Sequence, residues 1–357
     1  MPLSRDNRKH HWLKRLLPVV LVLLLALVFL FDRVFFPPPM QMFQQQREMM
    51  DTWVTITVYN RDPDLAVRAI ETVFSRMEEI EQIASIYDEH AEAYVLNEQG
   101  RLDDPSPELI EIIEAAAETS RLSGGAFDIT VEPLLELWRY APGADKQFWE
   151  LEPLEQQEAL SEATALIGPD RVSVTAGPSI VLAPGTKITL GGIAKGYAVD
   201  QGLEALRAAG VKHGLIDAGG DIGALGGKPN NEHWEIVLRN PNDSADFLVR
   251  FGLTDGAIAT SGNYERYFDP AAEVGHIMDP RTGFSSHNAS SATVIAPTCT
   301  QADALATAVF VLGPIDGIDL VDTLEVVEAF VVGYEEPSRL YRSEGLGAFE
   351  QSEKGGL

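Results

Sequence analysis

The chain has 357 residues, and 45% of them are hydrophobic, which is enough for a substantial buried core and argues against wholesale disorder. Its 54 Asp and Glu residues outnumber its 27 Lys and Arg residues, and the resulting formal charge of −27 offers no general basic field for a nucleic acid. The single cysteine, Cys299, excludes an internal disulfide, a thiolate zinc cluster and a CxxC redox pair.

The N-terminal segment differs in charge from the rest of the chain. Residues 1–49 carry a local charge of +4, and the other 308 residues carry −31. Sixteen apolar residues without a charge lie between Arg15 and Asp32. This run is slightly short for a full membrane span of about 20 residues and long for a signal-peptide core, and no small-x-small cleavage site follows it.

For residues 1–36 we therefore predict a cytoplasmic tip and an uncleaved signal anchor, which is one N-terminal transmembrane helix. The basic end marks the cytoplasmic side. The protein would then be a single-pass protein of the inner (cytoplasmic) membrane, with its folded part on the periplasmic side. Cleavage at an unrecognised site and a buried core helix are the alternatives.

Residues 37–48 are rich in Pro and Gln without a helical apolar period, which predicts a tether. Folding is expected to begin near Met49. The β-branched and aromatic run at residues 53–59 predicts a strand. Residues 65–83 and 108–122 repeat apolar residues at helical spacing and predict two surface helices.

After an acidic helical stretch around residues 149–166, the chain turns to short β-rich runs separated by Gly, Pro and Asn. Two helices, at residues 194–209 and 300–312, interrupt these runs. This order predicts an α+β fold with mixed β-sheets and segregated helices rather than a doubly wound sheet. We expect one domain over residues 49–345 and a loose C-terminal tail at residues 346–357.

Two glycine-containing segments have the composition of anion sites. Residues 217–227 follow the apolar start of a strand and could bring N–H groups to a phosphate, with a structural turn as the alternative. Residues 189–200 read as a strand, a Gly-Gly turn and a helix start, an arrangement that presents N–H groups and a positive dipole to an anion. Lys195 in the first helical turn is unfavourable for the helix dipole but useful to a phosphate.

Two further positions carry polar groups that are suited to catalysis. Asp303 and Thr307 lie four residues apart on one face of a predicted helix, and offer two hard oxygen ligands of the kind that Mg²⁺ takes. A carboxylate that supports its own helix, with a threonine bonded to the preceding turn, is the alternative. His276 ends a predicted strand before an Asp-Pro-Arg-Thr-Gly turn, where it is either a catalyst or a structural residue.

Taken together, these motifs resemble those of the FAD:protein FMN transferase family, the ApbE-type flavin transferases. In chain order they are AFD (Ala126–Asp128), LGGIAKGYAVD (Leu190–Asp200), IDAGGD (Ile216–Asp221), ATSGNYE (Ala259–Glu265), HIMDPRTG (His276–Gly283) and ADALAT (Ala302–Thr307). The likeness extends upstream to MDTWVTI (Met50–Ile56) and SIYDEHAEAYVLN (Ser85–Asn97), so it covers roughly residues 50–345.

The resemblance implies an ApbE-like flavin transferase fold that binds FAD in a cleft, takes Mg²⁺ at its pyrophosphate and moves the FMN half to a Thr or Ser hydroxyl of a partner, with release of AMP. The implied Mg²⁺ ligands are Asp303 and Thr307, with main-chain oxygens at Gly192 and Ala306. The residues implied to hold the flavin nucleotide are Met50, Tyr87, Ala126, Phe127, Asp128, Thr189, Lys195 and Ile277. His276 matches the histidine that deprotonates the acceptor hydroxyl.

Two positions depart from the family pattern. Thr189 stands where an Asp commonly precedes the Leu-Gly pair, and Ala91 replaces the Ser that often precedes the Glu of the early motif. Both departures bear on adenine or ribose contacts, and neither removes the metal site.

The implied acceptors are exported domains, such as the flavin-carrying subunits of membrane redox complexes, modified at a short Asp/Ser-Gly-Ala-Thr type motif. A non-enzymatic FAD-binding or flavin-reserve protein, and a pyrophosphatase that converts FAD to FMN and AMP, remain as alternatives. The presence of Asp303, Thr307 and His276 together favours the transferase, because binding alone does not need the histidine.

Overall fold

The computed structural model describes residues 16, 18–21, 38–139, 146–175, 177, 179–241, 243–263, 267–269, 274–334 and 339–351. The anchor predicted for residues 1–36 lies almost entirely outside these ranges. Among the helices that are described, none combines the length and the apolar character that a membrane crossing needs. The anchor therefore stays a prediction.

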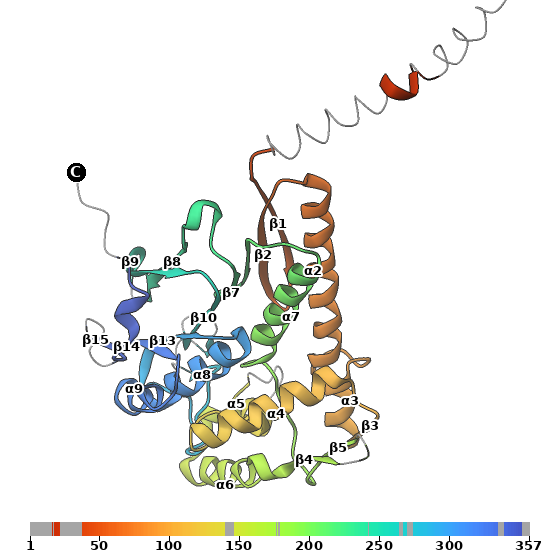
Figure 1. The fold of residues 1–357 in the computed structure, drawn as a ribbon. Coiled ribbons are helices and arrows are strands. Elements are labelled where there is room, and N and C mark those ends of the chain that lie inside the picture. The colour runs from red at the N-terminus through yellow and green to blue at the C-terminus, as the bar shows by residue number, and fades with distance from the viewer. Residues whose placement is uncertain are drawn as a thin grey trace, which may run out of the picture.

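An eight-stranded sheet forms the centre of the described fold (Figure 1). Its strands, in spatial order, are β1 (Gln41–Met49), β2 (Thr52–Asn60), β6 (Gly214–Ala218), β7 (Asp221–Leu225), β10 (Gly256–Ser261), β13 (Ala289–Ala296), β14 (Glu328–Gly333) and β15 (Leu340–Arg342). Every neighbouring pair is antiparallel. Alternate side chains of β2, namely Val54, Ile56 and Val58, are fully buried in the main core, as the two-residue period of a strand requires.

Helices cover one face of this sheet. They are α2 (Pro63–Ala84), α7 (Ala194–Ala208), α8 (Cys299–Leu312) and α9 (Pro314–Asp322). Asp62 starts α2, because its side chain accepts hydrogen bonds from the N–H groups of Asp64 and Leu65. Residues of α8 are buried on nearly every side, so the helix runs through the core rather than along the surface.

A hairpin of β8 (Trp234–Asn240) and β9 (Asp243–Leu253) covers the opposite face of the sheet. Trp234 and Phe251 of this hairpin pack with Ile258 and Phe330 of the sheet in a second, smaller core. The central strands β7, β10, β13 and β14 therefore lie between two apolar layers.

The remaining elements lie together at the end of the molecule that is lowest in Figure 1. They are α3 (Glu92–Gln99), α4 (Pro107–Leu122), α5 (Glu132–Trp138), α6 (Pro153–Thr164) and a three-stranded sheet of β3 (Arg101–Asp103), β5 (Ser179–Leu182) and β4 (Val172–Thr175). A short pair, β11 (Tyr267–Asp269) and β12 (Val274–Gly275), completes the strands. Leu134, Trp138, Phe148 and Leu160 form a third apolar cluster here.

The α+β class is confirmed, and the longest periodic segments of the sequence form the expected elements: β2, α2, α4, α7 and α8. One point of the predicted fold class is corrected, since every described strand pairing is antiparallel and the sheets are not mixed in direction. Antiparallel neighbours need no crossover of fixed hand. Long helical segments separate some neighbouring strands in the sequence, such as β2 from β6 and β13 from β14.

The tether predicted for residues 37–48 is wrong from Gln41 onward, because Gln41–Met49 form β1. This strand pairs with all nine residues of β2, from Gln41 opposite Asn60 to Met49 opposite Thr52. Its polar composition suits an edge strand that is exposed on one side, which the sequence pattern does not distinguish from a linker.

The loose tail predicted for residues 346–357 is also wrong as far as residue 351. Leu346 is buried, and the N–H of Gln351 donates to the carbonyl of Arg250 at 2.8 Å. Glu350 pairs with Phe251 as an isolated bridge, so this segment covers the free edge of β9. Residues 352–357 lie outside the described ranges.

Candidate functional site

The site is built where the first turns of α7 and α8 cross at Gly196. A Cβ atom at Gly196 would lie 2.7 Å from the carbonyl carbon of Cys299 and 2.8 Å from Cβ of Asp303, so only glycine permits this approach. The N–H of Gly196 donates to Oδ2 of Asp303 at 3.0 Å. In return, the Asp200 carboxylate accepts from the N–H groups of Cys299 and Thr300, both at 2.8 Å. Each helix thus supplies a carboxylate to the N-terminus of the other.

The oxygen atoms expected to hold a metal lie beside this crossing. Thr307 follows Asp303 by one turn of α8, and its Oγ1 lies 3.2 Å from Oγ of Ser261 at the end of β10. Gly192, in the turn before α7, lies against the same hydroxyl, since a Cβ there would be 3.2 Å from Thr307 Oγ1. Ala306 is fully buried within α8.

The Gly192 carbonyl has no backbone donor among the described residues, because the N–H of Gly196, four positions later, turns to Asp303 instead. A carboxylate, a hydroxyl and a backbone carbonyl are hard oxygen donors, so this set has the chemistry that Mg²⁺ prefers. Within the described residues no group of three or more His, Cys, Asp and Glu side chains is arranged for a metal. A cation at this position therefore takes hydroxyl and carbonyl oxygens in addition to its carboxylate.

The carboxylates of Asp303, Asp221 and Asp200 interact electrostatically and concentrate negative charge near these oxygens. Burial, reinforced by the charge of Asp221, raises the pKa of Asp303 to about 7. Burial likewise raises the pKa of Asp200, although its hydrogen bonds to Thr300 and Cys299 oppose the shift. Lys195 forms an ion pair with the buried Asp221, so it partly neutralises this cluster. A bound divalent cation would stabilise the ionised carboxylates further.

The segment of Asp217–Gly227 contains a tight β6–β7 hairpin, and its approach to a phosphate stays a prediction. Gly219 and Gly220 form the turn with φ angles of +65° and +98°, and the N–H of Gly220 donates to Oδ1 of Asp217 at 3.0 Å. The contribution of this hairpin to the site is Asp221, which begins β7 and holds Lys195.

The motif Ala126–Asp128 lies against the turn before α7. The ring of Phe127 is near Gly192, since a Cβ there would lie 3.2 Å from Phe127 Cε2. Asp128 caps the short helix η1 (Ile129–Val131), accepting hydrogen bonds from Thr130 N at 2.8 Å and Thr130 Oγ1 at 2.6 Å. Burial raises the pKa of the Asp128 carboxyl.

Thr189 is joined to the same segment, because its N–H donates to the Ile129 carbonyl at 2.7 Å. The strand predicted before Gly191 is wrong, since residues 186–190 belong to no strand or helix. The helix start predicted after the Gly-Gly turn is confirmed at Ala194.

Asn263 ties the segment of His276 and Ile277 to the chain that follows β10. The side chain of Asn263 accepts from the N–H of Ile277 at 3.2 Å and donates to the Ser286 carbonyl at 2.8 Å. Asn263 follows Ser261, which contacts Thr307, by two residues. The half-buried His276 therefore begins a hairpin, residues 276–286, whose two ends are bonded to Asn263 just after β10.

Among the described residues, no hydrogen bond, ion pair or ring contact joins Met50 or Tyr87 to the α7–α8 crossing. Met50 lies in the β1–β2 turn with a φ of +53°, and its N–H donates to Oε1 of Glu81 at 2.9 Å. Tyr87 is 69% exposed, and the guanidinium of Arg139 lies 6.0 Å from its ring centroid. Both remain predicted flavin contacts.

Sequence reasoning missed Asp221, Asp200 and Ser261 as members of the site. Asp221 ends the quoted IDAGGD motif and Asp200 ends LGGIAKGYAVD, so each stood at the edge of a segment already singled out. Their partners, Lys195 and the N-terminus of α8, are 26 and about 100 residues away, respectively, and no local pattern connects them.

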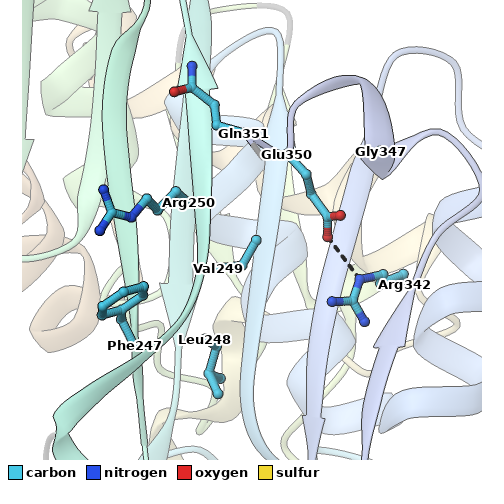
Figure 2. A pocket seen from close by; sticks show the side chains of 8 residues that line it. All are labelled: Phe247, Leu248, Val249, Arg250, Arg342, Gly347, Glu350 and Gln351. Carbon is cyan, nitrogen blue, oxygen red and sulfur yellow. Dashed lines mark hydrogen bonds and ion pairs between the residues drawn. The ribbon is translucent and has the colours of Figure 1, made fainter. Parts of the chain in front are cut away.

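Two concave surfaces in the described part of the chain lie away from these residues. The first, of about 400 Å³, lies between β9 and the C-terminal segment, and Figure 2 shows Arg342 paired with Glu350 at its rim. Leu248 and Val249 of β9 contribute to its lining. The second, of about 450 Å³, lies between α6 and the turn that follows His276.

Comparison with known proteins agrees with the motifs. A model of the ApbE family matches residues 50–331. The FAD:protein FMN transferase of Haemophilus influenzae is 30% identical over 254 residues, which cover 68% of this chain and 72% of that protein. The crystal structure of the ApbE protein of Thermotoga maritima is similar with a TM-score of 0.77 and 30% identity, over 87% of this chain and 100% of that one. The flavin transferase ApbE of Vibrio cholerae has a TM-score of 0.75 and 25% identity over the same shares.

Replacement of Gly196 by alanine tests the helix crossing. The new Cβ has no room between α7 and α8, so Gly196→Ala should lower the free energy of unfolding by about 1–3 kcal/mol, the usual cost of overpacking. Gly347→Ala is the matched control, because no atom lies within 4 Å of its Cβ position. Chemical denaturation of both variants measures the difference. Equal stability of Gly196→Ala and the wild type would contradict the close crossing.

Proposed function

Since the chain belongs to the ApbE family, and is thereby an FAD:protein FMN transferase, we propose that it moves the FMN half of FAD to a Thr or Ser hydroxyl of an exported acceptor protein, in a Mg²⁺-dependent reaction that releases AMP. The observation that carries the proposal is the oxygen set of Asp303, Thr307 and Gly192 beside the crossing of two helix N-termini. A pyrophosphate suits this place, because its charge is opposite to that of the helix ends.

Asp303 and Thr307, with the main-chain oxygens of Gly192 and Ala306, would hold the cation. A bound Mg²⁺ supplies charge neutralisation at the pyrophosphate, which otherwise repels a nucleophile. Lys195 lies on the first turn of α7 and adds a positive charge next to these ligands. Its ion pair with Asp221 fixes the ammonium group in place before the nucleotide binds.

The flavin nucleotide is assigned to Met50, Tyr87, the Ala126–Asp128 segment, Thr189 and Ile277. Contacts in the structure support part of this set, since Phe127 lies against Gly192 and Thr189 is bonded to the same segment. Phe127 is only 4% exposed, so its contact with Gly192 fixes this segment beside the metal-ligand candidates.

His276 is proposed to take the proton of the acceptor hydroxyl. A neutral hydroxyl is a poor nucleophile, and an imidazole with an ordinary pKa near 6.5 is a suitable base at neutral pH. The position of His276 supports this role, because Asn263 accepts a hydrogen bond from the adjacent Ile277 and follows Ser261, which contacts Thr307, by two residues. The hydroxyl attacks phosphorus, and AMP leaves as the bond within the pyrophosphate breaks.

For localisation we propose a single-pass protein of the inner membrane whose catalytic domain faces the periplasm. Five basic residues before the apolar run at residues 16–31 support this orientation. Acceptors would then be exported subunits of membrane redox complexes. Residues 38–351 provide the described fold, which begins at β1 almost directly after the anchor.

The base role predicts that His276→Ala binds FAD with unchanged affinity but transfers FMN about 10²- to 10⁴-fold more slowly, the usual worth of a positioned base. The wild-type rate should rise with pH through the range in which an imidazole loses its proton, and that rise should disappear in the variant. His233→Ala, a change at an exposed histidine bonded to Thr254, is the control. Unimpaired flavinylation by His276→Ala would refute the role.

The metal role is tested by Asp303→Asn rather than by alanine. Asp303 is only 4% exposed and accepts from the N–H of Gly196, so alanine would remove a structural hydrogen bond as well as the candidate metal ligand. Asparagine keeps that acceptor oxygen and removes the negative charge that the Asp221 carboxylate repels. The melting temperature without Mg²⁺ should therefore not fall.

In the same variant, Mg²⁺ should no longer raise the melting temperature, and the apparent Mg²⁺ affinity in transfer should fall at least about tenfold, the lower limit known for residues that only support metal ligands. Thermal unfolding with and without Mg²⁺, together with transfer at limiting Mg²⁺, measures both effects. A wild-type Mg²⁺ response in Asp303→Asn would count decisively against this site.

The anchor is tested by fractionation of cells that make the full chain. The mature protein should keep its N-terminus and stay with the membrane fraction after a high-salt wash, because an apolar helix is not released by screening of charge. A soluble product that begins near residue 37 would contradict the anchor.

A further inference from the structure

The concave surface of about 450 Å³ between α6 and the turn after His276 has not been given a role above. Its walls include Gln157, Leu160, Ser161 and Thr164 from α6, and Thr282 and Phe284 from the turn. We call this surface the α6 groove. It is open to solvent, and the exposed ring of Phe284 forms part of it.

The α6 groove is connected to the proposed catalytic base by one hairpin, residues 276–286. Met278 pairs with Ser285 as an isolated bridge, and the N–H of Ser286 donates to the carbonyl of Ile277 at 2.9 Å. The base of the hairpin is held by Asn263, next to the contact between Ser261 and Thr307. The tip of the hairpin therefore forms a wall of the groove while its base lies beside the metal-ligand candidates.

The groove is held in shape before any ligand binds. Gly283 has a φ of +82°, and a Cβ atom there would lie 3.0 Å from Cδ2 of Leu160, so the turn fits closely against α6. Nε1 of Trp138 donates to the Gly283 carbonyl at 2.8 Å, and the Trp138 and Phe284 rings meet edge to face with centroids 5.9 Å apart. The tip of the hairpin is thus fixed by a buried hydrogen bond and by ring packing.

The lining of the groove carries a single charged side chain, although the protein is strongly acidic. Its one charged lining residue, Arg281, donates from Nε and Nη2 to the two carboxylate oxygens of Asp279, at 2.9 and 2.8 Å. None of the described lining residues is an acid, although the chain carries a formal charge of −27. Amide and hydroxyl groups of Gln157, Ser161 and Thr282 offer partners for peptide N–H and C=O groups, and Phe284 offers an apolar surface.

We propose that the α6 groove docks an extended, uncharged segment of the acceptor polypeptide that flanks the hydroxyl to be modified. An uncharged segment fits because a charged one would leave its charge without a partner. His276 and Arg281 are five residues apart, at most about 17 Å at about 3.3 Å per residue. An acceptor segment of about five extended residues covers that interval. This inference rests on the proposed FMN transfer.

The test compares two substitutions of exposed helical serines in the full chain. Ser161→Trp fills the groove, whereas Ser75→Trp makes the same change on α2, away from it. The probes are a peptide with the core sequence Ser-Gly-Ala-Thr, and the same core extended by about five uncharged residues on each side. FMN transfer is read from the mass of the peptide, and FAD affinity from the quenching of flavin fluorescence.

The wild type should have a lower KM for the long peptide than for the short one. Ser161→Trp should raise the KM for the long peptide at least roughly tenfold, as expected when a clash replaces a docking contact, and leave the short peptide and FAD affinity unchanged. Ser75→Trp should behave like the wild type. An unchanged KM for the long peptide in Ser161→Trp would overturn the docking proposal alone.

Other outcomes separate the two proposals further. If Ser161→Trp changes the oligomeric state of the protein while the KM stays constant, a second copy of the chain occupies the groove and the proposal is overturned. If the wild type transfers FMN to neither peptide nor to any acceptor protein, the proposed function itself fails, and the docking proposal fails with it.

Discussion

Two carboxylates, the buried Asp303 and the half-buried Asp200, hold the N-termini of α7 and α8 against each other, and the arrangement of the site depends on this exchange. Asp303 of α8 accepts from the first turn of α7, and Asp200 of α7 accepts from the first turn of α8. The crossing is close enough to exclude a Cβ at Gly196. Burial raises the pKa of both carboxyls, so their ionised forms depend on helix N–H groups and on nearby positive charge.

The sheet fixes what surrounds this crossing. Gly223 of β7 allows α7 to approach, because a Cβ there would lie 2.7 Å from atoms of Val199 and Leu203. The same strand begins with Asp221, which pairs with Lys195 on the side of α7 that faces the site. Ser261, at the end of β10, is hydrogen-bonded to Thr307. The glycines of the sequence motifs therefore serve mainly as points of close packing, and the polar residues next to them form the site.

Elements that depend on local patterns of side chains could be predicted from the sequence, whereas contacts between distant segments could not. β2, α2, α4 and α7 follow from local periodicity, since each buries one regular set of side chains, whereas α8 follows from a continuous apolar run that is buried on nearly every side. β1 has no such set, because it is polar and gains its order from pairing with β2. The spacing of Asp303 and Thr307 left a structural role open, and the motif resemblance made them metal-ligand candidates, whereas the burial of Asp303 and the pairing of Lys195 with Asp221 arise from contacts across long stretches of chain.

The most direct test of the account is the stoichiometry of the reaction. The full chain is incubated with FAD, Mg²⁺ and an exported flavoprotein subunit that carries a Ser-Gly-Ala-Thr sequence, and FMN bound to the acceptor is measured by intact mass alongside free AMP. A transferase yields equal amounts of the two products, and without Mg²⁺ no transfer is expected. AMP in large excess over bound FMN would identify a pyrophosphatase, and the absence of both products would leave a protein that only binds flavin; either result would contradict the account.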